Sequence, residues 1–477
     1  MDGEQITVSI TQAIPRLPEA QPCDSLDWII RKGEQWAIVG ANGSGKSQIA
    51  GILQGKYPLK QGTVRFHSKR KINEIVRCIA FRDIYSLADC RNAYYQQRWH
   101  ATETDTMPNV RDLLPDTPND TFTEMIYTLF HIRESLSKRI IHLSSGELRK
   151  FLIIRTLLLR PEILILDNPF IGLDAASRKI LLQMLEQMVS LQGLQVVLLL
   201  SDPADIPSMI THVLPVSCLR PSFPRTRVAF LADKQLQSEL FPDVIPPLLP
   251  PRKEAIPYKI AFRMEHVTVS YNGKTILKDI CWEAKNGERW ALCGANGSGK
   301  SLLLSLLYAD NPQAYAQSLH LFDRKRGTGE SIWDIKRRIG YVSPEMHLYY
   351  MENVTVTEVV CSGFFDAVGQ FRRCNPAQKE TAIAWMRVFG IETLKDRMFP
   401  SLSTGEQRLT LLARAFVKDP DLLILDEPLH GLDVANKRRV THIIESFCEA
   451  DGKTLIYVTH YPDELPSCVN RRYELCN

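Results

Sequence analysis

The chain has 477 residues, which at about 150 residues per domain predicts two to four domains. Its 58 Lys and Arg residues against 54 Asp and Glu residues leave a net charge of +4, too little to indicate nucleic acid as the main partner. An apolar content of 44% and a charged content of 23% are ordinary for a folded protein and exclude a largely disordered chain.

The N-terminus, MDGEQITVSI, lacks the basic start and the apolar run of a secretory signal. No stretch reaches the roughly 18 uncharged apolar residues that a membrane-spanning helix needs, because the richest one, 151–166, is interrupted by charged residues and by Pro161. We therefore expect a cytoplasmic protein with no transmembrane segment of its own. The 11 cysteines are scattered without a CxxC pair, which favours reduced thiols over a disulfide framework or a zinc knuckle.

Three motifs occur twice in the same order, and this indicates a duplicated domain rather than a short solenoid repeat. They are GANGSGKS at 40–47 and 294–301, LSSGE at 143–147 matched by LSTGE at 402–406, and ILILDNP at 163–169 matched by LLILDEP at 422–428. In each half the pattern predicts a strand, a glycine loop and a helix, then a helical middle, a long helix and a short apolar strand. Uninterrupted apolar strands are typical of a parallel sheet covered on both faces, so the predicted fold class is α/β, present twice.

Six prolines fall between residues 241 and 257, between the two copies. Proline at this density removes backbone donors and favours an extended, semi-rigid spacer. We expect a first domain over residues 1–228, a Pro-rich linker over 229–257 and a second domain over 258–477.

The repeated octet fits the pattern GxxxxGK[ST]. In that pattern the glycines let backbone N–H groups converge on an anion, the following helix adds its dipole, the Lys reaches the β- and γ-phosphates, and the Ser hydroxyl holds Mg²⁺. Two copies in register with two other repeated motifs predict two nucleotide sites. The predicted phosphate-binding residues, of which Ser47 and Ser301 are also predicted Mg²⁺ ligands, are Gly40, Ala41, Asn42, Gly43, Ser44, Gly45, Lys46 and Ser47, and Gly294, Ala295, Asn296, Gly297, Ser298, Gly299, Lys300 and Ser301.

Each apolar strand ends in an Asp, Asp167 or Asp426, whose carboxylate can bind Mg²⁺ through its water shell. The next residue in the second half is Glu427, a candidate general base for an attacking water. The first half has Asn168 at this position, and an amide orients water but takes no proton near neutral pH.

A second difference between the halves follows the next apolar strand. The second half has His460 there, well placed to contact a γ-phosphate, whereas the first half has Ser201 and Asp202, and an anion would repel phosphate. Neutral drift at a packing position is the alternative explanation for Asn168. We favour a loss of catalytic function, because both departures fall at chemically related positions.

These residues resemble the ATP-binding domains of ABC (ATP-binding cassette) proteins, present twice in one chain. The resemblance implies two P-loop NTPase domains in tandem, each with a central, mostly parallel sheet, an antiparallel β part and a helical subdomain. It implies ATP and Mg²⁺ as ligands, with Asp167 and Asp426 linked to the magnesium, Glu427 as the catalytic Glu and His460 as the switch His.

The repeated LSSGE and LSTGE motifs match the family's signature sequence, with Ser145 and Thr404 where a second Gly is usual. The resemblance therefore assigns nucleotide contacts to Ser144, Gly146, Glu147, Ser403, Gly405 and Glu406.

Tyr271 fits the family's aromatic residue that stacks on adenine, whereas no aromatic residue precedes Trp28 in the first half. In the family, a Gln senses Mg²⁺ and the transport partner. The spacing of residues does not decide which residue of this chain takes that position. Glu345 is the nearest candidate in the second half, and Gln96 and Gln97 are candidates in the first.

Family geometry implies a head-to-tail pair of cassettes within one monomer, with each ATP between one phosphate loop and the other cassette's signature. The site with Lys300, Glu427 and His460 is then complete. The site with Lys46 and Asp167 lacks the base, the switch His and the aromatic residue. We predict an ATPase with one hydrolytic site and one site that binds ATP and turns it over slowly or not at all.

The segment RGTGESIWDIK at 326–336, with residues 339–347, resembles the tandem ATP-binding proteins associated with molybdate transport, the ModF type or photorepair group. This implies the ATPase of a molybdate or other oxyanion transport system, peripheral on the cytoplasmic face of the inner membrane and docked on a separately encoded membrane protein. The alternative is a soluble ATPase switch that acts on a ribosome or on DNA. The Pro-rich linker argues against the ribosomal class, whose cassettes are joined by a long, charged helical arm.

Overall fold

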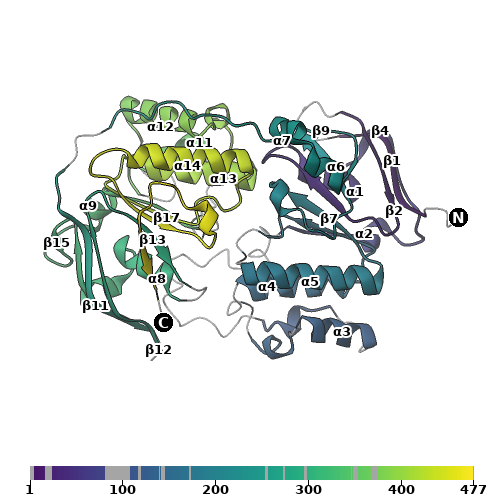
Figure 1. Cartoon of the computed structure of the whole chain (residues 1–477), viewed down its shortest axis with the longest axis horizontal. Coiled ribbons are helices and arrows are strands. Elements are labelled where there is room, and N and C mark those ends of the chain that lie inside the picture. The colour runs from purple at the N-terminus through teal and green to yellow at the C-terminus, as the bar shows by residue number, and fades with distance from the viewer. Residues whose placement is uncertain are drawn as a thin grey trace. The chain divides into compact units, whose positions relative to one another are not determined.

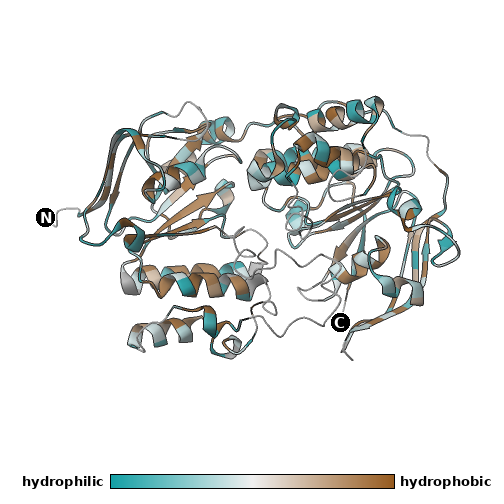
Figure 2. Cartoon of the chain, turned by 180° about the vertical axis from the view of Figure 1, so that it is seen from behind, coloured by the Kyte–Doolittle hydropathy of each residue, from teal (hydrophilic) through white to brown (hydrophobic). Residues whose placement is uncertain are grey.

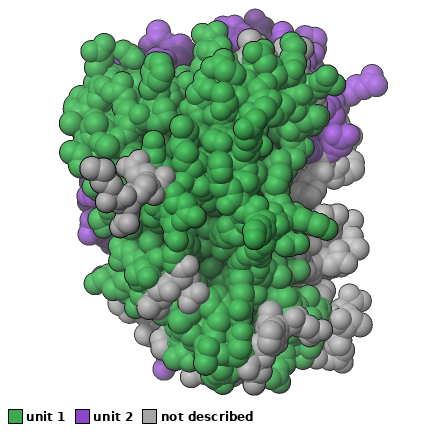
Figure 3. Space-filling view, turned by 90° about the vertical axis from the view of Figure 1, so that its right-hand side faces the viewer, with its two compact units in different colours: residues 1–242, 433–435 green, residues 243–432, 436–477 purple. Residues whose placement is uncertain are grey.

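The chain is described from a computed structural model that covers residues 5–16, 24–80, 108–115, 120–130, 132–138, 140, 145–170, 173, 175–252, 256–271, 274–294, 298–344, 346, 353–366 and 373–475. Its residues fall into two compact units, coloured separately in Figure 3. Unit 1 comprises residues 1–242 and 433–435, and unit 2 comprises residues 243–432 and 436–477. Across the described ranges, no helix is both long enough and apolar enough to cross a membrane.

The described part of unit 1 contains a seven-stranded central sheet of order β10-β8-β3-β7-β6-β5, with β9 paired to β8. Strands β7 and β9 are labelled in Figure 1. The strands from β8 to β5 run parallel, and the short β9 and β10 are antiparallel to β8. The strands are β3 (Trp36–Val39), β5 (Val76–Ala80), β6 (Ile163–Asp167), β7 (Gln195–Leu200), β8 (His212–Ser217), β9 (Arg220–Pro221) and β10 (Arg225–Thr226).

A second sheet of unit 1 is antiparallel. Its order is β2-β1-β4, with β1 (Ile6–Pro15), β2 (Leu26–Arg31) and β4 (Leu59–Phe66). The helices are α1 (Lys46–Leu53), α2 (Ile72–Ile75), α3 (Thr121–Leu129), α4 (Ser145–Leu157), α5 (Ala175–Gln192), α6 (Arg227–Ala232) and α7 (Lys234–Leu240).

Strand β6 shows why the central strands are apolar on both faces. Leu164 packs into a cluster with Phe151 of α4 and Leu185 of α5, whereas its neighbour Ile165 packs into a second cluster with Ile49 of α1. Alternate side chains of a strand point to opposite faces, so each strand residue enters one core or the other. The apolar colour of the central strands in Figure 2 reflects this double burial.

Unit 2 repeats the same plan. Its central sheet has the order β16-β17-β18-β13-β19 and is parallel throughout the described strands, and its antiparallel sheet has the order β12-β11-β14-β15. The strands are β11 (Ile260–Tyr271), β12 (Lys274–Lys285), β13 (Arg289–Cys293), β14 (Ser318–Leu321), β15 (Arg324–Lys325), β16 (Ile339–Val342), β17 (Leu422–Asp426), β18 (Thr454–Val458) and β19 (Arg471–Glu474).

The helices of unit 2 are α8 (Lys300–Leu307), α9 (Ile332–Lys336), α11 (Val356–Ser362), α12 (Pro376–Val388), α13 (Thr404–Phe416) and α14 (Val434–Cys448). In both units the strand before the glycine loop and the strand that ends in Asp flank the same intervening strand, β7 or β18. The predicted α/β fold, present twice, is confirmed.

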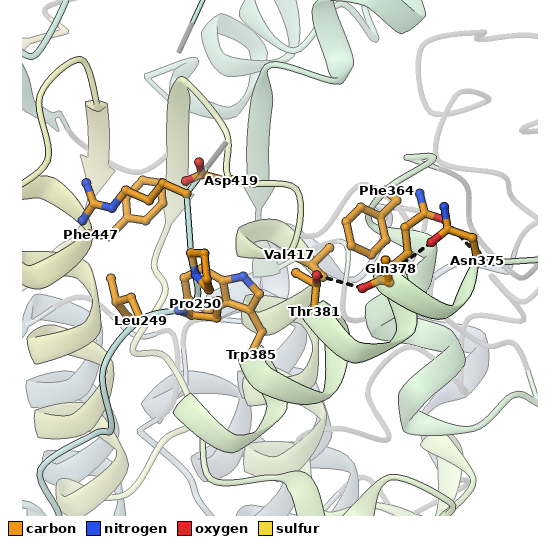
Figure 4. A pocket seen from close by; sticks show the side chains of 13 residues that line it. Leu249, Pro250, Phe364, Asn375, Gln378, Thr381, Trp385, Val417, Asp419 and Phe447 are labelled. Carbon is orange, nitrogen blue, oxygen red and sulfur yellow. Dashed lines mark hydrogen bonds between the residues drawn. The ribbon is translucent and has the colours of Figure 1, made fainter. Parts of the chain in front are cut away.

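The Pro-rich segment begins later than position 229. Residues 227–240 form α6 and α7, and Phe230, Leu240 and Phe241 are buried in the core of unit 1. Described residues from 242 to 252 form neither helix nor strand. Leu249 and Pro250 line a pocket of about 230 Å³ together with side chains of unit 2, including Trp385 of α12 and Phe447 of α14 (Figure 4). This segment therefore packs on side chains of unit 2.

Candidate functional site

Each glycine loop ends in a left-handed glycine from which a helix starts. Gly45 has a φ of +101° and Gly299 a φ of +94°, a region that favours glycine, and α1 and α8 begin at the next residues, Lys46 and Lys300. A Cβ atom on Gly40 would lie 2.1 Å from a backbone carbonyl oxygen of β8. Both loops thus have the close backbone approach and the helix N-terminus that suit an anion.

The lysines that open these helices lie against the loops. Lys46 Nζ donates to the carbonyl oxygens of Gly40 and Ala41, both at 2.8 Å, and Lys300 Nζ donates to that of Gly294 at 2.7 Å. Burial lowers the pKa of Lys46 to about 8 and also lowers the pKa of Lys300, although neighbouring carboxylates oppose both shifts. An added phosphate would favour the charged form of each lysine, so both loops favour an anionic ligand.

Oxygen ligands suited to magnesium lie together in the first cassette. Ser47 Oγ donates to Asp167 Oδ2 at 2.9 Å. The second cassette has the same arrangement along the chain, because Ser301 follows Lys300 in α8 and Asp426 ends β17. Hydroxyl and carboxylate oxygens are the ligands that Mg²⁺ prefers, so the donor set fits this ion. When bound, it would neutralise charge on the β- and γ-phosphates.

Glu427, directly after β17, lies between two histidines. Its Oε1 is 3.0 Å from His460 Nε2, and its Oε2 is 3.8 Å from His430 Nδ1. Burial alone would raise the pKa of Glu427, but the hydrogen bond from His460 and the positive charges of His430 and Arg408 hold this pKa at about 2. The carboxylate is therefore ionised at neutral pH, as a base that accepts a proton from water must be.

Arg408 fixes the backbone around Glu427, a role that sequence analysis missed. Arg408 is a residue of α13, its side chain is buried, and its guanidinium donates to four carbonyl oxygens. These belong to Ser343 at 2.8 Å, Asp426 at 2.9 Å, Glu427 at 2.6 Å and Pro428 at 3.3 Å. The signal in the sequence was an Arg inside the apolar run of a helix, where an unpaired charge would be strongly unfavourable.

Asn168 occupies in unit 1 the backbone position that Glu427 occupies in unit 2. Both residues have a left-handed backbone conformation, with φ of 50° and 47°. Both backbone N–H groups donate to the neighbouring strand, to Leu199 O at 3.0 Å and to Val458 O at 2.9 Å. The two cassettes therefore differ here in side-chain chemistry and not in backbone geometry.

Strand register identifies the residue that corresponds to His460. The final Asp of β6 pairs with Leu199, and the final Asp of β17 pairs with Val458. Ser201 and His460 each come two residues beyond that partner, so Ser201 takes the place of the histidine. The neighbouring Asp202 accepts a hydrogen bond from the backbone N–H of Ala204 and thereby caps the following turn.

Ser201 joins a cluster of neutral side chains in unit 1. Its Oγ lies 3.2 Å from Asn168 Oδ1 and 3.1 Å from Asn42 Oδ1, within hydrogen-bond distance of both. Asn168 Nδ2 donates to Asp167 Oδ1 at 2.9 Å. This cluster offers amides and a hydroxyl where the second cassette offers a carboxylate and an imidazole.

The second signature forms a helix N-terminus. Ser403 is the N-cap of α13, its hydroxyl accepts from the N–H of Glu406, and the carboxylate of Glu406 accepts from the N–H of Ser403 at 2.7 Å. Gly405 is buried in the first turn. In the first signature, the carboxylate of Glu147 accepts from Lys138 Nζ at 2.8 Å. Both signature carboxylates thus bond within their own cassettes, and their contact with nucleotide stays a prediction.

The aromatic residues that precede the phosphate loops in the chain differ between the units. Tyr271 ends β11, is half-buried, and its hydroxyl hydrogen-bonds to the side chain of Asn311. Trp28 lies in β2, buried and packed edge-to-face on Trp36 with ring centroids 5.2 Å apart. Trp28 is therefore a core residue, and the lack of an adenine-stacking aromatic residue in the first half stays a prediction.

The remaining predicted site residues either lie where the sequence places them or fall outside the described residues. Gly43 and Ser44 lie in the first loop, Ser298 lies in the second, and Gly146 lies in the first turn of α4. Outside the described residues lie Ser144, Ala295, Asn296, Gly297, and the three Gln-position candidates Glu345, Gln96 and Gln97.

Comparison with known proteins gives matches along nearly the whole chain. A family profile described as ABC transporter matches residues 23–171 and 277–430. The chain is similar to the ABC transporter ATP-binding protein ModF of Escherichia coli, at 35% identity over 98% of this chain and 96% of that protein. It is also similar to an uncharacterised ABC transporter ATP-binding protein of Schizosaccharomyces pombe, at 31% identity over 94% of this chain and 93% of that protein.

Solved structures with two cassettes are also similar in fold. An archaeal ribosome recycling factor, in complex with a ribosomal stalk protein, matches 97% of this chain and 86% of its own with a TM-score of 0.58. An RNase-L inhibitor matches 94% of this chain and 84% of its own with a TM-score of 0.55. The identities are 20% and 19%, so these likenesses concern the fold alone.

Proposed function

Since the chain belongs to the ABC transporter family of ATP-binding proteins, with two cassettes and ATPase activity, we propose that it hydrolyses ATP with Mg²⁺ at one site only. The hydrolytic site is that of unit 2, with Lys300, Glu427 and His460. The site of unit 1, with Lys46 and Asp167, binds ATP and turns it over slowly or not at all.

The observation that carries this proposal is the exchange of side chains at two equivalent backbone positions. In unit 2, the ionised carboxylate of Glu427 is hydrogen-bonded to His460 and can accept a proton from an attacking water. In unit 1, Asn168 and Ser201 are hydrogen-bonded to each other and provide no group that takes a proton near neutral pH. Both units keep the phosphate-loop lysine, which supports ATP binding at both.

The asymmetry predicts that unit 1 can be given activity. Asn168→Glu combined with Ser201→His should restore the carboxylate and the imidazole on an unchanged backbone. Introduced into the Glu427→Gln background, the pair should raise ATP turnover at least about tenfold, which is only part of the roughly 10²–10⁴-fold that a well-placed general base contributes. Phosphate release under saturating Mg-ATP measures the gain.

The matched control for this gain is the Asn168→Gln, Ser201→His pair, which supplies a similar volume and the imidazole without a carboxylate. Turnover should stay at the background level in this control. Equal turnover in both double variants would show that the missing base does not limit the first site.

For the partner, we propose a separately encoded membrane protein of a transport system for molybdate or another oxyanion, which this chain serves from the cytoplasmic face of the inner membrane. The similarity to an E. coli ABC transporter ATP-binding protein over 98% of this chain supports the transport role. The described residues contain no helix that could span a membrane, so transport would need the partner.

A pull-down with tagged Glu427→Gln protein and ATP tests the partner. Blocking hydrolysis should prolong the ATP-bound state, and membrane and soluble fractions are analysed separately. A multi-spanning membrane protein enriched over the wild-type bait supports the transport role. Ribosomal or nucleic-acid components without such a protein would overturn it.

A soluble switch that acts on the ribosome is the second candidate function. The fold similarity to a ribosome recycling factor along both cassettes is the observation that favours it. Co-sedimentation of this chain with ribosomes at physiological salt, dependent on ATP, would support this candidate over the transport role.

A further inference from the structure

Two β-bulges lie on either side of the pair Val267–Ile280 in the antiparallel hairpin of unit 2, one in each strand. Between the pairs Met264–Trp282 and Val267–Ile280, β11 has one residue more than β12; between Val267–Ile280 and Val269–Leu277, β12 has one residue more than β11. An extra residue in a strand breaks the regular alternation and re-aims a side chain. The bulges therefore change which side chains meet on the solvent face of this hairpin.

The side chains brought together are His266, Asp279 and Cys281. His266 and Asp279 are both left-handed, with φ of 52° and 53°. His266 Nδ1 lies 2.6 Å from Asp279 Oδ1 and 3.8 Å from Cys281 Sγ, and one ligand atom from each residue lies within 4.8 Å of the others. All three residues are exposed, so an ion can reach them from solvent.

We propose that His266, Asp279 and Cys281 form a binding site for a divalent transition metal ion of the zinc type. An imidazole nitrogen, a thiolate sulfur and a carboxylate oxygen are the three kinds of ligand that proteins offer to zinc. Mg²⁺ and Ca²⁺ prefer oxygen ligands throughout, so this set selects against the ion of the nucleotide sites. Binding releases the thiol proton of Cys281 to solvent as the sulfur becomes a thiolate ligand.

The spacing suits a tetrahedral ion. Metal–ligand bonds of about 2.0–2.3 Å place neighbouring ligand atoms of a tetrahedron about 3.3–3.8 Å apart. The separation of His266 Nδ1 and Cys281 Sγ, 3.8 Å, already lies in this range. The shorter contact between His266 and Asp279 has to open by under about 1 Å, which rotation of an exposed carboxylate provides. Three protein ligands leave the fourth position to water.

The site would join β11 to β12 in the hairpin whose first strand ends at Tyr271. It is built entirely from unit 2 and uses none of the residues of the phosphate loops. Its existence is therefore independent of which site hydrolyses ATP and of the partner.

Cobalt(II) is the probe, because a thiolate ligand gives it a near-ultraviolet charge-transfer band that oxygen ligands do not give. Full-length, nucleotide-free, reduced protein is stripped with chelator and titrated with Co²⁺. We expect a band that saturates at one equivalent and is displaced by Zn²⁺. Cys281→Ser should abolish the band, and His266→Ala should weaken binding at least about tenfold.

Cys218→Ser is the matched control, since Cys218 is another exposed free cysteine outside this cluster. This control should keep the band and the affinity. The circular dichroism spectra of all variants should match that of the wild type, and Zn²⁺ should raise the unfolding temperature of the wild type and of Cys218→Ser only. A band that survives in Cys281→Ser, or the absence of any saturable thiolate band in the wild type, would overturn the proposal.

Discussion

Glu427→Gln should lower steady-state ATP turnover of the whole chain by about 10²–10⁴-fold, the range expected when a general base is removed. The substitution keeps the size of the side chain and its ability to hydrogen-bond to His460, but it removes the ionised carboxylate whose pKa lies near 2. Phosphate release under saturating Mg-ATP measures the change. Binding of a fluorescent ATP analogue should be retained, because the lysines of both phosphate loops are untouched.

Glu449→Gln is the control for this variant, since Glu449 is an exposed carboxylate at the end of α14 and lies outside the site. Its turnover should equal that of the wild type. The contrasting change is Asn168→Ala, which removes the equivalent side chain of unit 1 and should leave most of the turnover. Turnover of Glu427→Gln above about a tenth of the wild-type rate would mean that a second centre hydrolyses ATP, and the one-site proposal would then be wrong.

The parts of the site that could be predicted are those set by a short run of residues. The phosphate loop needs glycine at fixed positions, because Gly45 and Gly299 are left-handed and Gly40 approaches a neighbouring strand. The apolar strands before Asp167 and Asp426 needed two buried faces, and the parallel sheets provide them. Local rules are visible in sequence because every residue that obeys them is adjacent in the chain.

The parts that could not be predicted depend on pairing between distant segments. The sequence left Ser201 and Asp202 as joint counterparts of His460, and only strand register assigns that place to Ser201. The absence of a CxxC pair argued against a zinc knuckle, yet two bulges bring His266 together with residues of the facing strand. Register shifts of one residue are decided by packing and leave no pattern that one sequence reveals.

The start of the linker also depends on contacts that the sequence alone does not reveal. Proline content predicted an extended segment, and the start of that segment depends on where the core of unit 1 ends. Phe230, Leu240 and Phe241 are buried there, so the chain stays with unit 1 until about residue 242. Apolar residues on short helices look alike in sequence whether they pack on a core or lie in a spacer.

Arg408→Met should destabilise unit 2 by at least about 3 kcal/mol, because it leaves four buried carbonyl oxygens without their donor. For a unit of this size the unfolding temperature should fall by roughly 6–12 °C. Arg408→Lys should also be destabilised, since one ammonium group cannot reach carbonyls of both Ser343 and Pro428 with the geometry of a planar guanidinium. Calorimetry of the full chain measures both changes.

Arg387→Met is the matched control, because Arg387 is an exposed arginine in the helical part of the same unit, paired with Glu392 on the surface. Its unfolding temperature should stay close to that of the wild type. Arg408 also holds the carbonyl of Glu427, so turnover of Arg408→Lys should fall even at temperatures where the protein is fully folded. An Arg408→Lys variant with reduced stability and unchanged turnover would show that Arg408 supports the fold without positioning the base. The separation of these two readouts matters because Asn168 and Glu427 share one backbone conformation and differ in side-chain chemistry, so backbone geometry alone does not distinguish the two sites.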